Sequence, residues 1–234
     1  MLGSETSTIR RLRWLLAAAQ IVIGTIAYWP SFRAGFVFDD PAHIHQNKAI
    51  RSLSSLLPAL ATTNRPVIYV TLWGNYAIGG LNVTGYHVLN LAIHLAAGIL
   101  LWRIVARTFE ERERRERTAP ICRNGWDRHA SVPGVAHMLG LSPLSVEWSG
   151  FAVAAIWIVH PLQTQAVTYV IQRCESLMGF FYLLSLYCLI RGAKQHGPWH
   201  ETSGRRWRRC HRGHPWYAAA MLAVSLGMGC KEVM

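Results

Sequence analysis

Two adjacent carboxylates, Asp39 and Asp40, follow the first apolar segment of the chain in the sequence FVFDDPAHIHQN. A carboxylate can take a proton from a hydroxyl group, so either residue is a candidate general base for transfer to an alcohol. Two close carboxylates resist double ionisation, so one of them keeps a proton or the pair binds a divalent cation. Adjacent side chains of an extended segment point apart, which gives them separate roles. We predict that one of the pair is the base and that the other orients the acceptor or the site.

A helix cap is the alternative interpretation of the same two residues. Aspartate is favoured at the position before a helix, and AHIHQN after Pro41 supplies a short helical segment. Asparagine caps a helix nearly as well as aspartate does. The cap interpretation therefore predicts that replacing either residue by asparagine has almost no effect.

Three cationic side chains are candidates for holding a phosphate group. Arg65, Arg173 and Lys231 each fall at or near the end of a predicted helix, on the same side as the aspartates. Arginine suits bidentate contact with phosphate, and lysine acts as a point charge. Each is equally explained as an interfacial residue whose stem lies along apolar surface while its charge reaches water. No glycine-rich phosphate loop is present, which is consistent with a phosphate carried on a lipid.

The segments that must position these residues are strongly apolar. Of the 234 residues, 51% are hydrophobic and 15% charged, whereas soluble domains carry about a quarter charged residues. The long apolar runs predict an all-α, polytopic helical membrane protein. We expect about five transmembrane helices, with short interfacial helices in an outer loop over residues 31–85. The predicted helices cover residues 12–30, 86–106, 147–160, 164–191 and 216–230.

The first of these helices shares its charge pattern with cleaved signal peptides. Three arginines precede an apolar run, but the run ends in Tyr28-Trp29-Pro30 and not in small residues. Tyrosine and tryptophan are typical of a membrane interface. We therefore predict a retained transmembrane helix, with a cleaved signal as the alternative.

The basic residues are gathered into three regions. Lys and Arg total 24 against 12 acids, and 18 of the 24 lie in the N-terminus, residues 103–147 and residues 191–215. The positive-inside rule predicts that these regions, and hence the N-terminus, are cytoplasmic. This topology explains the net charge of +12 without a nucleic-acid partner, and it also allows contact with anionic lipid headgroups. The membrane is either a bacterial inner membrane or the endoplasmic reticulum.

Two stripes of polar residues recur at helical spacing within the apolar segments. Polar groups at membrane depth are costly, so the stripes are expected to face each other or a wet cavity. Hydrogen bonding between helices is the simpler alternative and needs no chemistry. The stripes consist of His87, Asn90 and His94 in one segment, and of Thr164, Thr168, Gln172 and Glu175 in another.

Several spaced motifs occur in an order that resembles one protein family. They are FVFDD, then RPVIYVTLWGNYAIGGLNVTGYHVLNLAIH, HPLQTQAVTYVIQRCESL, FYLLSLYCLIRG and LGMGCKEV. In these motifs the chain resembles the transmembrane and tetratricopeptide-repeat O-mannosyltransferases and their bacterial relatives, within the C-type superfamily of lipid-phosphate-sugar glycosyltransferases. The resemblance covers residues 36–233 except for the two basic loops.

The resemblance implies a multi-spanning enzyme that moves a sugar, expected to be mannose, from a polyprenyl- or dolichyl-phosphate donor to a protein Ser or Thr hydroxyl on the non-cytoplasmic face. It implies a lipid-linked donor, a protein acceptor and membrane lipid as partners. One departure is that Thr164 precedes Gln165, where the family often has a glutamate. The resemblance places catalytic acids at Asp39 and Asp40. It also places substrate-binding residues at Arg65, His87, His160, Arg173, Glu175, Lys231 and Glu232.

The family pattern also predicts further spans and C-terminal repeats. We therefore expect residues 1–234 to be the N-terminal part of a larger membrane domain, inactive by itself. Two other classes of function stay open at this point. One is a non-catalytic membrane anchor for a C-terminal repeat module. The other is a transporter, since intramembrane histidines can relay protons, although no inverted repeat is visible.

The cysteines suggest neither a disulfide framework nor a zinc site. There are five, an odd number, and no CxxC pair. Cys210, His211 and His214 lie close together in a basic run, but no fourth ligand follows at a zinc spacing. A divalent cation at Asp39 and Asp40 is therefore the one metal that the sequence suggests.

Overall fold

The computed structural model describes residues 2–118, 143–196 and 214–231. Within these ranges every regular element is a helix, which confirms the predicted all-α class. Three helices are long and apolar enough to cross a membrane, and a bent pair over residues 144–168 adds a fourth crossing if it is one span. The three long helices are α1 (Leu2–Tyr28), α4 (Val83–Thr118) and α8 (Arg173–His196).

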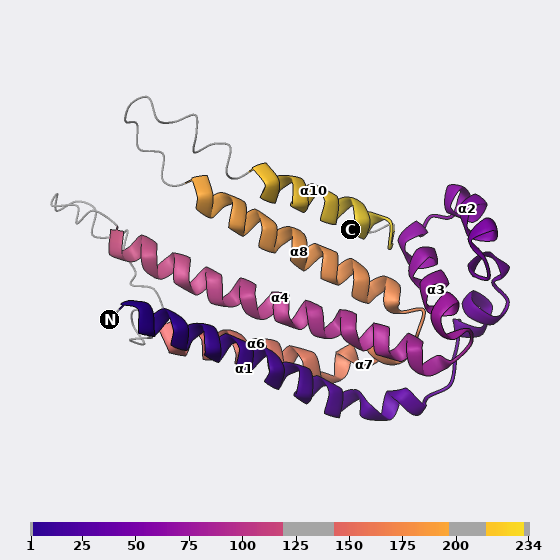
Figure 1. The fold of residues 1–234 in the computed structure, drawn as a ribbon, viewed down its shortest axis with the longest axis horizontal. Helices are drawn as coiled ribbons and strands as arrows, with labels where there is room; N and C mark the ends of the chain where they lie inside the picture. The colour runs from indigo at the N-terminus through magenta and orange to yellow at the C-terminus, as the bar shows by residue number, and fades with distance from the viewer. Residues whose placement is uncertain (1, 119–142, 197–213, 232–234) are drawn as a thin grey trace.

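Five helices lie side by side in an elongated bundle, with α4 at its centre (Figure 1). Helix α4 packs against α6 (Pro143–Val159) and α8, α1 packs against α6 and α4, and α8 packs against α10 (His214–Met228). Helix α10 corresponds to the fifth predicted span. Its 15 residues fall short of the roughly 20 that a bilayer core requires.

The two ends of the bundle differ in composition. At one end α1 begins, α4 and α8 finish, and α6 and α10 begin (Figure 1); we call this the basic end because it holds the residues that flank both basic segments. The opposite end carries the acid pair. Residues 31–85 form short helices there, as predicted for this segment. They are η1 (Trp29–Arg33), η2 (Pro41–His45), η3 (Lys48–Ile50), α2 (Leu53–Thr62) and α3 (Pro66–Gly79).

The central helix is longer than predicted. The expected span ended at residue 106, whereas α4 continues to Thr118 through the sequence RTFEERERRER. Arginine and glutamate are good helix formers, and opposite charges three or four residues apart stabilise an exposed helix. Part of the region predicted as a basic loop is therefore a helix.

The prediction of one continuous helix over residues 164–191 is wrong. The structure has η4 (Pro161–Gln163), then α7 (Thr164–Thr168), and a non-helical linker over residues 169–172 before α8. The axis bends by 55° between α6 and the η4–α7 segment. Because of this break, the residues from Thr164 to Glu175 do not form one stripe on one helix.

The polar stripe of α4 is buried, and its last member, His94, hydrogen-bonds to the neighbouring helix α6. His94 Nε2 lies 2.9 Å from the Ile158 carbonyl oxygen. The same oxygen accepts a hydrogen bond of 2.9 Å from the Tyr28 hydroxyl. The helices approach closely because Gly98 has no side chain, since a Cβ there would lie 2.5 Å from Ile158 Cδ1. At His94 the stripe therefore serves hydrogen bonding between helices, which was the simpler alternative to a wet cavity.

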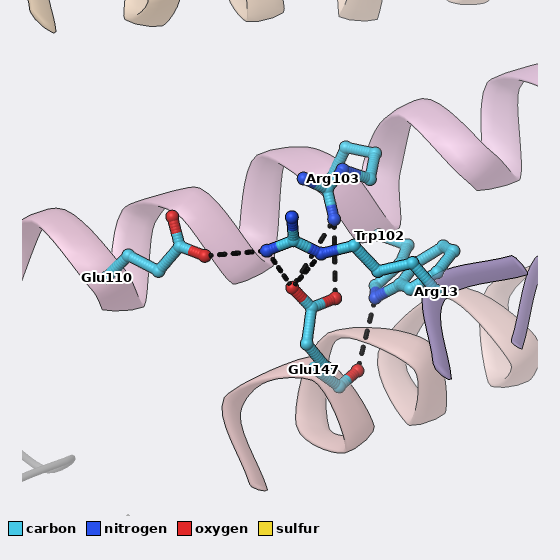
Figure 2. A network of polar contacts seen from close by, with 5 residues as sticks. All are labelled: Arg13, Trp102, Arg103, Glu110 and Glu147. Carbon is cyan, nitrogen blue, oxygen red and sulfur yellow. Dashed lines mark hydrogen bonds and ion pairs between the residues drawn. The ribbon is translucent and has the colours of Figure 1, made fainter. Parts of the chain in front are cut away.

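A buried carboxylate joins three helices at the basic end (Figure 2). Glu147 of α6 is 1% exposed and accepts hydrogen bonds from Arg13 Nε of α1 at 2.7 Å and from Arg103 Nη1 of α4 at 3.3 Å. Its backbone oxygen accepts from Trp102 Nε1 at 3.1 Å, and Arg13 Nη2 also contacts Glu110 Oε1 at 3.2 Å. We call these five residues the Glu147 cluster. Because α1 supplies Arg13, the cluster joins α1 to α4 and α6.

Candidate functional site

A tight turn gives the two aspartates opposite surroundings. The Asp40 amide donates to the Val37 carbonyl at 3.0 Å, and Phe38 has a φ of 52°. This left-handed conformation is unusual for a bulky residue, and such strain is concentrated at functional sites. Asp39 is exposed, whereas Asp40 is completely buried. The separate orientation expected for adjacent side chains is thus present.

Asp40 binds backbone amides that are distant in sequence. Its Oδ1 accepts from the Ile171 amide at 2.8 Å, and its Oδ2 accepts from the Val170 amide at 3.3 Å and the Val37 amide at 3.2 Å. Asp40 occupies the position before η2, but its side chain makes no hydrogen bond to that helix. The carboxylate therefore anchors the linker between α7 and α8 and does not act as the cap of η2.

The opposite side of the same linker is held by Asn90 and Arg173. The Asn90 amide donates to the Tyr169 carbonyl at 3.0 Å, and its oxygen accepts from Arg173 Nε at 2.8 Å. Arg173 Nη2 donates to the Tyr86 carbonyl at 3.1 Å. Asn90 and Arg173 are both fully buried. This network holds the linker from α4, while Asp40 holds it from the segment between α1 and α4.

Arg173 was predicted to lie near the end of a helix; it is the first residue of α8, but its side chain lies inside the bundle. Its Nη1 is buried and has no hydrogen-bond partner among the described residues. His87 is also fully buried, and its Nε2 lies 3.3 Å from the Ala34 carbonyl oxygen. Both side chains lie close enough to Asp40 for their charges to interact. Asp40 is thus flanked by the buried side chains of His87 and Arg173 inside the bundle.

Two of the predicted phosphate ligands come together at the acid-pair end. Lys231 donates a hydrogen bond to Glu175, which raises the pKa of the lysine, and the nearby positive charge of Arg65 partly offsets this effect. The Val67 amide donates to the Gly229 carbonyl at 3.2 Å and so joins the start of α3 to the end of α10. Lys231 and Glu175 thus form an ion pair within electrostatic reach of Arg65, and we call these three residues the Lys231 group.

The two remaining predicted binding residues lie apart from these groups or outside the described chain. His160 is exposed, and its Nδ1 accepts from the Leu162 amide at 3.2 Å, which caps η4. Glu232 lies outside the described residues. The His-Pro motif therefore has a local structural use at the bend that follows α6.

The acid pair does not fit a shared divalent cation. Both oxygens of Asp40 already accept backbone hydrogen bonds, while Asp39 is exposed on the other side of the turn. In the part of the chain that the structure describes, no three His, Cys, Asp or Glu side chains converge as a metal site would require. Cys210 and His211 lie outside that part. The geometry of the pair therefore favours separate roles for the two aspartates over joint binding of a cation.

The anchoring role of Asn90 and the whole Glu147 cluster were not predicted from the sequence. Asn90 is recognisable there as one member of a polar stripe, but its spacing does not reveal that it binds Tyr169 and Arg173. Glu147 carries a clearer signal, since it is the one carboxylate in the apolar segment 147–160. A charge in such a segment usually has a specific partner.

The fold and these groups define a polytopic helical membrane protein with an acid pair and the Lys231 group at the same end of its bundle. Protein O-mannosyl-transferase Tmtc3 of Drosophila melanogaster is 28% identical over 195 residues, which covers 77% of this chain and 19% of the relative. Protein O-mannosyl-transferase TMTC4 of Homo sapiens is 24% identical over 92% of this chain and 27% of its own length. Protein O-mannosyl-transferase TMTC2 of Mus musculus is 23% identical over 90% of the chain.

Curated homologues of this chain are therefore TMTC-family protein O-mannosyl-transferases, at 23–28% identity over most of its length, which confirms the resemblance to that family. The chain spans only about a fifth of the length of the curated relatives it matches. No family model matches it, and no solved structure does.

Proposed function

We propose that the chain forms part of a membrane glycosyltransferase that moves mannose from a polyprenyl- or dolichyl-phosphate to a Ser or Thr hydroxyl of a protein. The names of the relatives support the reaction class. The observation that carries the assignment of roles is the contrast between an exposed Asp39 and a buried, fully bonded Asp40.

In this proposal Asp39 is the general base. An exposed carboxylate can accept the proton of the acceptor hydroxyl while the hydroxyl oxygen attacks the anomeric carbon of the sugar. Asp40 is a positioning residue, because its oxygens hold the turn and the linker and are not free to accept a proton. The buried network of Asn90 and Arg173 supports that position by holding the same linker.

The Lys231 group is the proposed site for the leaving phosphate. The bond between the sugar and the phosphate breaks in the transfer, so negative charge grows on the departing lipid phosphate. Arg65 and Lys231 stabilise that charge, and Glu175 holds the lysine in place until the donor binds.

Replacing Lys231 by alanine in the full-length protein is expected to weaken binding of dolichyl-phosphate-mannose about tenfold, because one charge-assisted hydrogen bond to the phosphate is lost. Titration of the purified protein with the donor measures this change. Lys48 is a matched control because it is an exposed lysine at the same end, and Lys48→Ala should leave donor affinity unchanged. Unchanged affinity in both Lys231→Ala and Arg65→Ala would reject the phosphate site.

The proposal requires the acid pair to face away from the cytoplasm, with the N-terminus inside. Single cysteines at His45 and Arg10, both exposed positions at opposite ends of the bundle, test this topology in a background without native cysteines. An impermeant maleimide applied to the non-cytoplasmic face of a sealed membrane should label position 45, and should label position 10 only after permeabilisation. The reverse pattern would exclude both the topology and the site.

A further inference from the structure

Two arginines next to the Glu147 cluster have no anionic partner among the described residues. Arg107 lies on α4 and Arg191 on α8, both at the basic end. The neighbouring arginines of the cluster are paired with Glu147 and Glu110. Within the described part of the chain, the side chains of Arg107 and Arg191 form no ion pair or hydrogen bond, and Arg107 Nε is a buried donor without an acceptor.

Aromatic rings hold both guanidinium groups in place. Arg107 Cζ lies 5.1 Å from the centroid of the Tyr187 ring, and Arg191 Cζ lies 4.5 Å from the centroid of the Trp216 ring. Tyr187 and Arg191 are one helical turn apart on α8, while Trp216 is in the first turn of α10. The four residues therefore join three helices, and tyrosine and tryptophan are typical of the membrane interface.

The charge around this group is positive. The side chains of Arg103 and Arg191 both act electrostatically on Arg107, and the one described acid that does so, Glu110, is already bound to Arg13. A buried N–H without an acceptor is costly. Arg107 Nε is such a donor, and guanidinium groups held over aromatic rings are suited to bidentate contact with phosphate oxygens.

We propose that Arg107 and Arg191 bind the phosphate of an anionic phospholipid at the basic end of the bundle. The site lies near the ends of two helices of membrane-spanning length. Exposed apolar residues lie on other faces of the same helices, including Leu189 on α8 and Met221 on α10, as in helices that contact lipid. The acyl chains of a phospholipid would lie in the bilayer beside these helices, where a soluble phosphate makes no contact. The proposal does not depend on the transferase function.

The test is the binding of phosphatidylglycerol to the purified chain in a neutral detergent, followed by native mass spectrometry. The chain is expected to retain one phosphatidylglycerol in preference to phosphatidylcholine. R107Q/R191Q should weaken this retention at least about tenfold, as expected for loss of charge-assisted hydrogen bonds. R107K/R191K should lie between the two, because lysine keeps the charge but lacks the planar fork.

R10Q/R11Q is the matched control, because it removes the same charge from exposed residues at the same end. If the proposal is correct, this variant retains the lipid like the unmodified chain. Equal losses in both double glutamine variants would show nonspecific attraction and overturn the site, as would release of the lipid by millimolar glycerol phosphate. Circular dichroism establishes that each variant is folded, and if R107Q/R191Q is not, R191Q alone should show a partial loss.

Discussion

Replacing Asp39 by asparagine in the full-length protein is expected to reduce mannosyl transfer roughly 10²–10⁴-fold, the usual contribution of a general base. Asparagine keeps the size and much of the hydrogen bonding of aspartate but cannot accept the proton. Because Asp39 is exposed and its side chain makes no hydrogen bond in the described structure, folding and donor binding should be retained. Transfer of radiolabelled mannose to an acceptor peptide measures the loss, and donor titration measures binding.

Asp40→Asn separates the proposed roles of the two neighbours. Only one oxygen would remain to accept from Val37, Val170 and Ile171, and the new NH₂ group would face backbone N–H donors. We therefore expect a lower yield of folded protein and poorer thermal stability, in contrast to the stable but inactive Asp39→Asn variant. If the Asp39→Asn variant transferred mannose at a near-normal rate, Asp39 would be excluded as the general base.

Replacing Glu147 by glutamine is expected to destabilise the bundle by about 2–4 kcal/mol. Removal of one partner from a buried ion pair usually costs about 3–5 kcal/mol, and the partial exposure of Arg13, 37%, reduces that cost. The loss leaves Arg13 and Arg103 close together without their shared carboxylate. Thermal unfolding in mild detergent should show a lower midpoint, by roughly 2–4 °C for each kcal/mol in a chain of this size.

Glu110→Gln provides the comparison for that experiment. Glu110 contacts the same Arg13 but is 35% exposed, and surface ion pairs contribute only about 0–1 kcal/mol. The unfolding midpoint of the Glu110→Gln variant should therefore stay within a few degrees of that of the unmodified chain. Equal shifts for Glu110→Gln and Glu147→Gln would mean that burial of the Glu147 carboxylate does not matter to stability.

The candidate site was partly predictable from the sequence. Arg65 and Lys231 were predicted as cations because each falls at or near the end of a predicted helix, and in the structure Lys231 pairs with Glu175 within electrostatic reach of Arg65. The acid pair was predicted from residue type alone. The sequence did not indicate which aspartate is exposed, because the answer depends on the Phe38 turn and on amides that lie 130 residues further along the chain.

Local sequence patterns predicted the helical class, the approximate positions of the helices and the gathering of the basic residues into three regions. These features follow from local patterns, since apolar runs of helical length and the charges between them are read from neighbouring residues. The tertiary structure decided where a helix breaks. Residues 164–191 have a continuous helical pattern, yet the linker 169–172 leaves the helix because Asp40 and Asn90 satisfy its amides and carbonyls. Backbone groups need a partner at membrane depth, and here distant side chains supply partners that no local pattern specifies.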